Sequence, residues 1–230
     1  MDSDRKISPS RDTDIDIDRA AVSPAVIKRL PRYFRYLREV KRMGKTRISS
    51  AELSRMMNVT ASQIRQDFNC FGGFGQQGYG YNVDFLYTNI CELLGVNRGF
   101  RAAVIGAGNL GKALVRSPMF EKRGVEVVAI FDVAEQTVGK VIADITVEHM
   151  DMLEKYFDEL NIDIAILTLP KEFAASAAQR LVNTGVKGIW NFTGKELELG
   201  ESGIVVENVH IGDSLMTLCY EIAINDSDGE

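Results

Sequence analysis

The stretch Arg101-Ala-Ala-Val-Ile-Gly-Ala-Gly-Asn-Leu-Gly111 decides the fold of the second half of this chain of 230 residues. Its apolar first part predicts a buried strand, and the spacing Gly106-x-Gly108-x-x-Gly111 predicts a tight turn into a helix. The first glycine permits the turn, the second lets a pyrophosphate approach the backbone, and the third lets the helix pack on the strand. The phosphates would lie at the positive N-terminus of that helix. The stretch is therefore typical of a dinucleotide-binding Rossmann domain.

An acidic residue after the next apolar run supports this interpretation, which the glycine spacing alone would not establish in a chain with 20 glycines. Asp132 follows the run Val125–Phe131 and would accept hydrogen bonds from the adenosine ribose hydroxyls, which favours NAD(H) over NADP(H). No basic residue follows Asp132 until Lys140, so a 2′-phosphate would find no partner there. A Rossmann-like fold with an empty site, or with another nucleotide such as coenzyme A, is the alternative.

Short β-rich runs alternate with helical segments after Arg98, and this alternation predicts an α/β domain with a doubly wound parallel sheet. The expected strands are Ala102–Ile105, Val125–Phe131, Asp163–Leu169, Gly188–Phe192 and Gly203–Val206. Thr168 and Pro170 end one of these runs at the carboxyl edge of the sheet, where ligands bind in open α/β folds. A plain strand-to-helix turn explains them equally well, because proline suits the first position of a helix. The candidate cofactor-binding residues are Gly106, Ala107, Gly108, Asn109, Leu110, Gly111, Asp132, Thr168 and Pro170.

A basic segment precedes this domain. Residues 23–95 carry eleven Lys and Arg against five Asp and Glu, whereas residues 96–230 carry twelve against twenty-one. A basic module joined to an acidic one suggests that the first binds a polyanion. Residues 1–22 carry four basic residues against six Asp and are expected to form a disordered acidic tail. We therefore expect a DNA-binding domain at residues 23–95, a dinucleotide-binding domain at 96–209, and a C-terminal helix and tail at 210–230.

Capping signals predict a helix-turn-helix within the basic segment. Ser49-x-x-Glu52 starts a short helix that Asn58 ends, and Thr60-x-x-Gln63 starts the next one. In helix-turn-helix proteins the second helix enters the major groove and presents its polar face to the base edges. The polar face of the second helix is therefore the candidate recognition surface.

The residues of that face have the chemistry to read bases, since Arg65 suits guanine and Gln66 or Asn69 suits adenine. Basic residues beside them would contact phosphates, which makes binding depend on salt. The glycine-rich run Phe71–Tyr81 suits a β-hairpin wing that reaches a neighbouring groove, before a last helix from about Val83 to Leu94. The candidate DNA-binding residues are Arg32, Arg35, Lys45, Arg47, Ser49, Thr60, Ser62, Gln63, Arg65, Gln66, Asn69, Gln76, Gln77 and Tyr79. The alternatives are an amphipathic helix pair, and a hairpin, that serve packing only.

Several classes of protein are disfavoured. The three cysteines, Cys70, Cys91 and Cys219, are widely spaced and include no Cys-x-x-Cys pair, which argues against a disulfide scaffold and against a metal site. No apolar run approaches the roughly 20 residues that a membrane span needs. The N-terminus alternates Asp with Thr and Ile where a signal peptide needs a continuous apolar stretch. We therefore expect a cytoplasmic protein without a metal.

The sequence offers no clear catalytic residue. A hydride-transfer enzyme usually needs an acid or base beside the nicotinamide and a domain for its substrate. Of the two histidines, His149 lies in Val147–Leu160, expected to be a surface helix, and His210 precedes the last helix, Gly212–Ile224. That helix is apolar around much of its circumference, so its own domain or a second subunit must cover it. The alternatives to a regulator are an NAD-dependent oxidoreductase with a basic N-terminal appendage, and a DNA-binding protein whose Rossmann domain only dimerises.

Six stretches together resemble the Rex redox-sensing transcriptional repressors, over about residues 23–224. They are Arg29–Leu37, Ser49–Leu53, Thr60–Val83, Gly106–Leu114, Phe131–Val133 and Gly185–Phe192. The resemblance implies a homodimer whose winged helices bind an inverted-repeat operator and whose Rossmann domains sense the NADH/NAD+ ratio. It also implies that the C-terminal helix is exchanged between subunits and that NADH releases the DNA.

Some positions depart from the commoner pattern of that family. Ser117 stands where many members have a tyrosine near the nicotinamide, and His210 where many have an aspartate that helps couple the cofactor state to the hinge. Both departures bear on how strongly the protein distinguishes NADH from NAD+. Gly194 and Gly200 each replace a usual proline. Gln66 replaces a basic residue on the recognition helix, which bears on the preferred operator bases.

Overall fold

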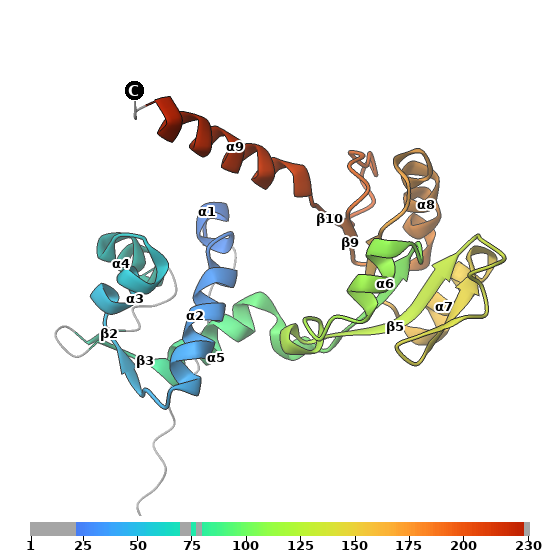
Figure 1. Cartoon of the computed structure of the whole chain (residues 1–230). Helices are drawn as coiled ribbons and strands as arrows, with labels where there is room; N and C mark the ends of the chain where they lie inside the picture. The colour runs from blue at the N-terminus through green and yellow to red at the C-terminus, as the bar shows by residue number, and fades with distance from the viewer. Residues whose placement is uncertain (1–21, 70–74, 77–79, 228–230) are drawn as a thin grey trace, which may run out of the picture. The chain divides into compact units, whose positions relative to one another are not determined.

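The computed structural model forms two compact units, Met1–Asn97 and Arg98–Glu230 (Figure 1). The structure describes residues 22–69, 75–76 and 80–227. The expected acidic tail, residues 1–22, lies outside these ranges apart from Val22, which is buried in the core of the first unit. No helix in the described part of the chain is long and apolar enough to cross a membrane.

The first unit combines helices with a three-stranded antiparallel sheet in the order β1-β3-β2. Its described elements are α1 (Pro24–Ile27), α2 (Leu30–Arg42), β1 (Arg47–Ile48), α3 (Ser50–Met57), α4 (Ala61–Asn69), β2 (Gly75–Gln76), β3 (Gly80–Asn82) and α5 (Val83–Leu94). The pair α3 and α4 is the expected helix-turn-helix, with Asn58 in the left-handed conformation at the end of α3. Strands β2 and β3 pair antiparallel within the run Phe71–Tyr81 and the next residue, where the sequence predicts the hairpin wing; residues 71–74 and 77–79 of that run lie outside the described residues.

Side-chain caps start the helices of this unit where the sequence predicts them. The Ser49 hydroxyl accepts a hydrogen bond from the Glu52 amide at 3.1 Å, and the Thr60 hydroxyl accepts one from the Gln63 amide at 3.1 Å. Each bond satisfies an amide that the first turn of a helix leaves without an intrahelical partner. The Glu52 side chain forms an ion pair with Lys45 instead of returning to the cap.

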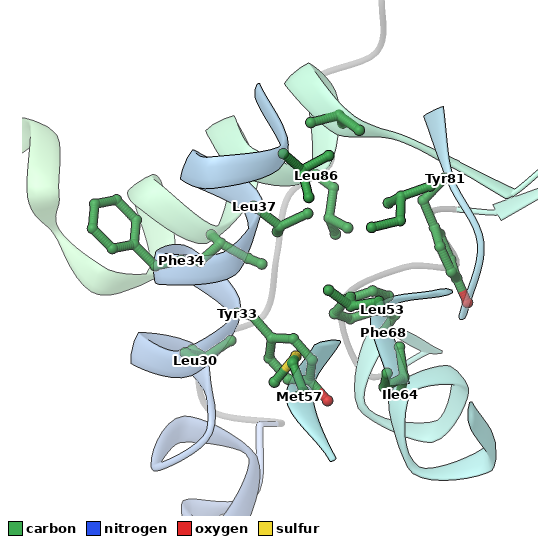
Figure 2. Packing of buried hydrophobic residues seen from close by; sticks show 14 of the residues in the cluster. Leu30, Tyr33, Phe34, Leu37, Leu53, Met57, Ile64, Phe68, Tyr81 and Leu86 are labelled. Atoms are coloured by element: carbon green, nitrogen blue, oxygen red, sulfur yellow. The ribbon is translucent and has the colours of Figure 1, made fainter. Parts of the chain in front are cut away.

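Aromatic residues lie at the centre of the core of the first unit (Figure 2). Tyr33 of α2, Phe68 of α4 and Tyr81 of β3 form a chain of contacts, with ring centroids 4.9 Å and 5.0 Å apart. Leu53 of α3 and Ile64 of α4 are fully buried in the same cluster. The apolar face of α4 is thus held against α2 and α3, and its polar face is turned to solvent.

The second unit is a seven-stranded sheet in the order β10-β9-β8-β4-β5-β7-β6. Its strands are β4 (Phe100–Ile105), β5 (Val125–Asp132), β6 (Val141–Ile142), β7 (Ile145–His149), β8 (Ile164–Leu167), β9 (Gly188–Asn191) and β10 (Val205–Asn208). All neighbours are parallel except β6 and β7. The chain moves outward from β4 in one direction and then from β8 in the other, so the strand order reverses between β4 and β8. This arrangement confirms the doubly wound α/β fold and places the ligand edge at the carboxyl ends of these strands.

Helices cover the two faces of the sheet unequally. On one face α7 (Leu153–Leu160) and α8 (Ala174–Leu181) pack against the sheet in one cluster, and on the other α6 (Asn109–Val115) packs in a second. The connection from β9 to β10 contains no helix, and beside it the α6 face has a cavity of about 540 Å³. Its apolar lining includes Phe120, Ile166, Trp190 and Val205. Part of this face therefore remains uncovered by the described residues of a single chain.

The last helix, α9 (Ile211–Ser227), is likewise uncovered. Its large apolar side chains are 40 to 66% exposed, namely Ile211, Leu215, Met216, Leu218, Tyr220, Ile222 and Ile224. The prediction that this helix is apolar around much of its circumference is confirmed. A helix of this composition is expected to be buried against another surface.

The segment Val147–Leu160 differs from the sequence prediction. Its first residues belong to β7, which pairs with β5, and α7 begins only at Leu153. His149 therefore ends a strand and does not lie on a helix. A tight hairpin joins β6 to β7 through Ala143 and Asp144, which both have positive φ, as a two-residue hairpin turn requires.

Smaller differences occur near the C-terminus of the sheet. Strand β10 is Val205–Asn208, two residues later than the expected Gly203–Val206. Gly194 and Gly200 adopt φ of +66° and +55°. Because the proline ring fixes φ near −65°, proline cannot adopt either conformation. Glycine, which accepts positive φ, therefore fits both positions and proline does not.

Candidate nucleotide and nucleic-acid sites

The glycine turn after β4 has the geometry that its sequence predicts. Gly106 has φ +101°, and a Cβ on it would lie 2.9 Å from the Thr168 carbonyl oxygen. A Cβ on Gly111 would lie 2.0 Å from the Gly106 carbonyl oxygen, so α6 packs on the turn only with glycine there. Gly108 caps α6 and has open space where a Cβ would stand. A phosphate group can therefore approach the N-terminus of α6 at Gly108.

Two side chains hold this turn in place. The Thr168 hydroxyl donates a hydrogen bond of 2.7 Å to the Gly106 carbonyl oxygen. Asp132 accepts hydrogen bonds from the Ala107 amide at 2.7 Å and the Ala134 amide at 2.8 Å, one on each carboxylate oxygen. A carboxylate has about four lone-pair sites, so Asp132 retains acceptor capacity for ribose hydroxyls.

The turn opens into a cavity of about 450 Å³ at the carboxyl edge of the sheet. Five predicted cofactor residues line it: Gly106, Gly108, Asp132, Thr168 and Pro170. Ala107 and Gly111 are buried behind the turn, and Asn109 and Leu110 are exposed on the first turn of α6. Pro170 precedes a 3-10 turn, Lys171–Phe173, as its cap and is not the first helical residue. Backbone amides beside an open glycine, with a carboxylate one strand away, fit the phosphates and ribose of a dinucleotide.

Leu169, which stands between the predicted Thr168 and Pro170, also lines the cavity. Six further lining residues were missed by sequence reasoning: Val133, Met150, Phe173, Ser176, Ala177 and Arg180. Val133 and Met150 directly follow β5 and β7, which is the only signal that could have found them. The others come from the β8–α8 connection and α8. No group of three or more His, Cys, Asp or Glu among the described residues could hold a metal ion.

Ser117 and His210, which bear on the expected discrimination between NADH and NAD+, both have local partners. The Ser117 hydroxyl, just after α6, accepts a hydrogen bond from the Met119 amide at 3.4 Å. His210 Nε2 lies 3.5 Å from a Glu196 carboxylate oxygen. Neither residue lines the cavity beside the glycine turn.

Helix α4, the predicted recognition helix, presents a polar face to solvent. Ser62, Arg65, Gln66 and Asn69 are exposed there. Arg65 Nη1 donates a hydrogen bond of 3.2 Å to the Ser50 hydroxyl of α3, which steadies its guanidinium at the surface. Side chains of these types can hydrogen-bond to base edges in a major groove.

Gln63 lies at the border of this face. Its amide nitrogen donates a hydrogen bond of 2.9 Å to Asp67, which is 1% exposed. Arg29, which directly precedes α2, and Tyr33 of α2 donate to the same carboxylate. Burial by itself raises the pKa of Asp67, but hydrogen bonds from Arg29, Tyr33 and Gln63 outweigh it and lower that pKa below its ordinary value. Sequence reasoning missed this buried carboxylate.

The predicted phosphate-contacting residues surround the helix pair. Arg32 donates to the Met57 carbonyl oxygen at 2.6 Å, and Lys45 pairs with Glu52. Arg35 and Arg47 are exposed, on α2 and β1. The Ser49 and Thr60 hydroxyls act as caps and remain exposed. Gln76 lies in β2, whereas Gln77 and Tyr79 lie outside the described residues.

Two family models match the chain, one on each unit. A CoA binding domain matches residues 97–194, and a model described as "Putative DNA-binding protein N-terminus" matches residues 21–69. The first covers the glycine turn and the residues that line its cavity. The second covers the helix-turn-helix.

The solved structures of similar fold include a Rex-family repressor called RSP. Its crystal structure has a TM-score of 0.82 at 45% identity, covering 89% of this chain and 95% of that one. RSP in complex with NAD+ and operator DNA has a TM-score of 0.82 at 47% identity, covering 91% and 98%. RSP in complex with NADH has a TM-score of 0.83 at 44% identity, covering 90% and 97%.

Curated relatives agree with these structures. The redox-sensing transcriptional repressor Rex of Caldicellulosiruptor bescii is 49% identical over 201 residues, 87% of this chain and 92% of that protein. Rex of Clostridium tetani is 48% identical over 199 residues, 86% of this chain and 94% of that protein. These relatives are named as repressors and not as enzymes. The chain belongs to the Rex family of redox-sensing transcriptional repressors.

Proposed function

We propose that this protein represses transcription by binding an inverted-repeat operator as a homodimer, and that NADH releases it from the DNA. The observation that carries the proposal is the pairing, in one chain, of an exposed recognition helix with a glycine-turn cavity that fits a dinucleotide. The solved relative RSP binds NAD+ together with operator DNA, and also NADH. Because a repressor must reach DNA, we place the protein in the cytoplasm.

The cavity supports a sensor more than an oxidoreductase. The amides at the start of α6 would hold the pyrophosphate, and Asp132 would hold the adenosine ribose. Among the residues that the structure describes, those that line the cavity include no His, Lys or Tyr to transfer a proton to a substrate. Binding without turnover is the behaviour that an effector site requires.

The basic face of the first unit supports DNA binding. We assign base contacts to Ser62, Arg65, Gln66 and Asn69, which lie on the exposed face of α4. We assign phosphate contacts to the residues around α4 and to the wing. Contacts of this kind position the helix on the DNA but do not distinguish one base sequence from another. Gln63 is assigned mainly to the Asp67 network, with its exposed part at the edge of the interface.

Two uncovered apolar surfaces of the second unit support a homodimer. The exposed side chains of α9 need a cover, and the cavity of about 540 Å³ beside Trp190 offers an apolar one. We propose that α9 of each protomer packs into this cavity of the other, which is the helix exchange that the family resemblance implies. Two recognition helices would then reach two half-sites about one DNA turn apart. NADH would act by preferring a dimer conformation that misplaces them.

An operator gel shift with NADH and NAD+ titrated separately tests this function. NADH should dissociate the complex at concentrations where NAD+ leaves it bound. Equal effects of the two nucleotides, or no effect of either, would remove the redox-sensor function and leave DNA binding intact. Oxidation of NADH over many turnovers with a small substrate would support the oxidoreductase alternative.

A further inference from the structure

The lining of the dinucleotide cavity includes a charged residue, Arg180, that no sequence motif predicts. Arg180 of α8 lines the cavity together with Val133 and Met150, which follow the carboxyl ends of β5 and β7. Asp132, to which we assign the ribose, directly precedes Val133. A base carried by that ribose would therefore lie near Val133, and Arg180 contacts Met150, which follows the neighbouring strand.

The Arg180 guanidinium is held in one orientation. Its Nε and Nη2 donate to the two carboxylate oxygens of Glu154, at 2.7 Å and 2.6 Å, and Nη2 also donates to the Met150 carbonyl oxygen at 2.8 Å. A bidentate pair of this kind fixes the plane of the guanidinium as well as its position. The hydrogen bonds from Arg180 also lower the pKa of Glu154 below its ordinary value, so the pair stays charged. Nη1 lies outside these three contacts.

We infer that Arg180 contacts the adenine base of the effector and that Glu154 is a positioning residue that orients Arg180; the inference rests on the proposed function. A guanidinium held in a plane stacks on an aromatic ring, and its flat face suits a purine. The apolar side chains of Val133, Phe173 and Ala177 line the same cavity and exclude water from that contact. Because Glu154 neutralises Arg180, the cavity offers a platform for the base without a free cation for a 2′-phosphate.

Calorimetric titration of the full chain with NADH, NAD+ and ADP-ribose tests the inference, because ADP-ribose carries the adenosine without the nicotinamide. Arg180→Met should weaken all three ligands by the same factor, about five- to thirtyfold. The preference for NADH over NAD+ should stay unchanged. Glu154→Gln should weaken the same three ligands by a smaller factor, since it loosens Arg180 without removing it.

Two controls separate this role from a loss of folding or charge. Lys187→Met removes a cation that pairs with Asp163 at 2.6 Å in the same unit but does not line the cavity, so ADP-ribose binding should not change. The double variant Glu154→Gln/Arg180→Met leaves no unpaired charge, and it should bind ADP-ribose as weakly as Arg180→Met does.

The outcomes distinguish the inference from the proposed function. Wild-type affinity of Arg180→Met for ADP-ribose would overturn the inference alone, as would recovery of binding in the double variant. A loss confined to NADH, with ADP-ribose unaffected, would also overturn it, because the defect would then lie at the nicotinamide. Absence of NADH binding by the unaltered chain would overturn the proposed function and the inference together.

Discussion

The Arg29 guanidinium donates two hydrogen bonds of 2.7 Å to the Asp67 carboxylate, across 38 residues of sequence. Asp67 belongs to the recognition helix α4, and Arg29 precedes α2. The Tyr33 hydroxyl donates a further bond of 2.7 Å to the same carboxylate. The rotation of α4 about its own axis is therefore fixed from inside the domain, by groups on the opposite side from its exposed polar face.

Breaking this network should weaken both folding and operator binding. Asp67→Ala leaves Arg29 without its partner, and we expect the free energy of unfolding to fall by about 3 kcal/mol. Tyr33→Phe removes one hydrogen bond to a charged group and should cost about 1.5 kcal/mol. Chemical denaturation measures both values. If Asp67→Ala had the same free energy of unfolding as the unaltered protein, the network would not be what holds α4 in place.

The pH dependence of unfolding should report the same carboxylate. The pKa of Asp67 is lower in the folded protein than its unfolded value of about 3.9, so its contribution to stability is fully present above that value. The contribution is lost as the pH falls from about 4 through the lower folded pKa. The difference in unfolding free energy between the unaltered protein and Asp67→Asn should therefore be constant near neutral pH and shrink below about pH 4. A difference that stays constant into acid would contradict the assignment.

Gly108→Ala should separate nucleotide binding from folding. Gly108 has φ −71° and open space where a Cβ would stand, so alanine is tolerated by the fold, with a melting temperature within a few degrees. The same methyl group occupies the approach of the pyrophosphate, and NADH affinity should fall at least tenfold. Gly111→Ala is the comparison, because its Cβ would meet the Gly106 carbonyl oxygen at 2.0 Å and the fold itself should suffer. If Gly108→Ala bound NADH with unaltered affinity, the assignment of the pyrophosphate to this turn would be wrong.

Arg65 and Arg47 should affect DNA binding in different ways. Arg65→Ala removes the proposed contact to a base, so it should cost about 1 to 3 kcal/mol and relax specificity at one operator position. Arg47→Ala should weaken binding about equally on all sequences and reduce the salt slope by about one. Fluorescence anisotropy with an operator and a scrambled duplex, at several salt concentrations, measures both. Equal losses on both duplexes for Arg65→Ala would reassign it to phosphate.

Local sequence patterns predicted most of the helices and strands, and strand β7 is one element that they did not predict. Capping residues, the glycine turn and alternating β-rich runs each act over a few residues, and the structure confirms the elements that they predict. The segment Val147–Leu160 was expected to be a helix, but its first three residues, up to His149, belong to strand β7. Val147 pairs with Ile130 of β5, which is remote in sequence, and this pairing makes the segment around Val147 a strand.

The candidate sites were predictable to the same extent. The turn at Gly106–Gly111 and the polar face of α4 are each contained in one short segment, and sequence spacing finds them. Arg180 and Asp67 carry no local signal, since each acquires its role from partners that only the folded chain brings near. Long-range ion pairs at the edges of a site are the part that a single sequence does not reveal.

Tryptophan fluorescence can report on the proposed exchange of α9. Trp190 is the single tryptophan of the chain, and it lines the cavity that α9 would fill. Leu215 is 61% exposed within one chain, so Leu215→Glu should leave each protomer folded while it disrupts the proposed interface. We expect a monomer by sedimentation, a shift of Trp190 emission to longer wavelength as water enters the cavity, and an operator affinity lower by about 100-fold. Glu221→Gln changes a polar position of the same helix and should leave all three unchanged. A dimer with unaltered emission in Leu215→Glu would place the cover of this cavity elsewhere.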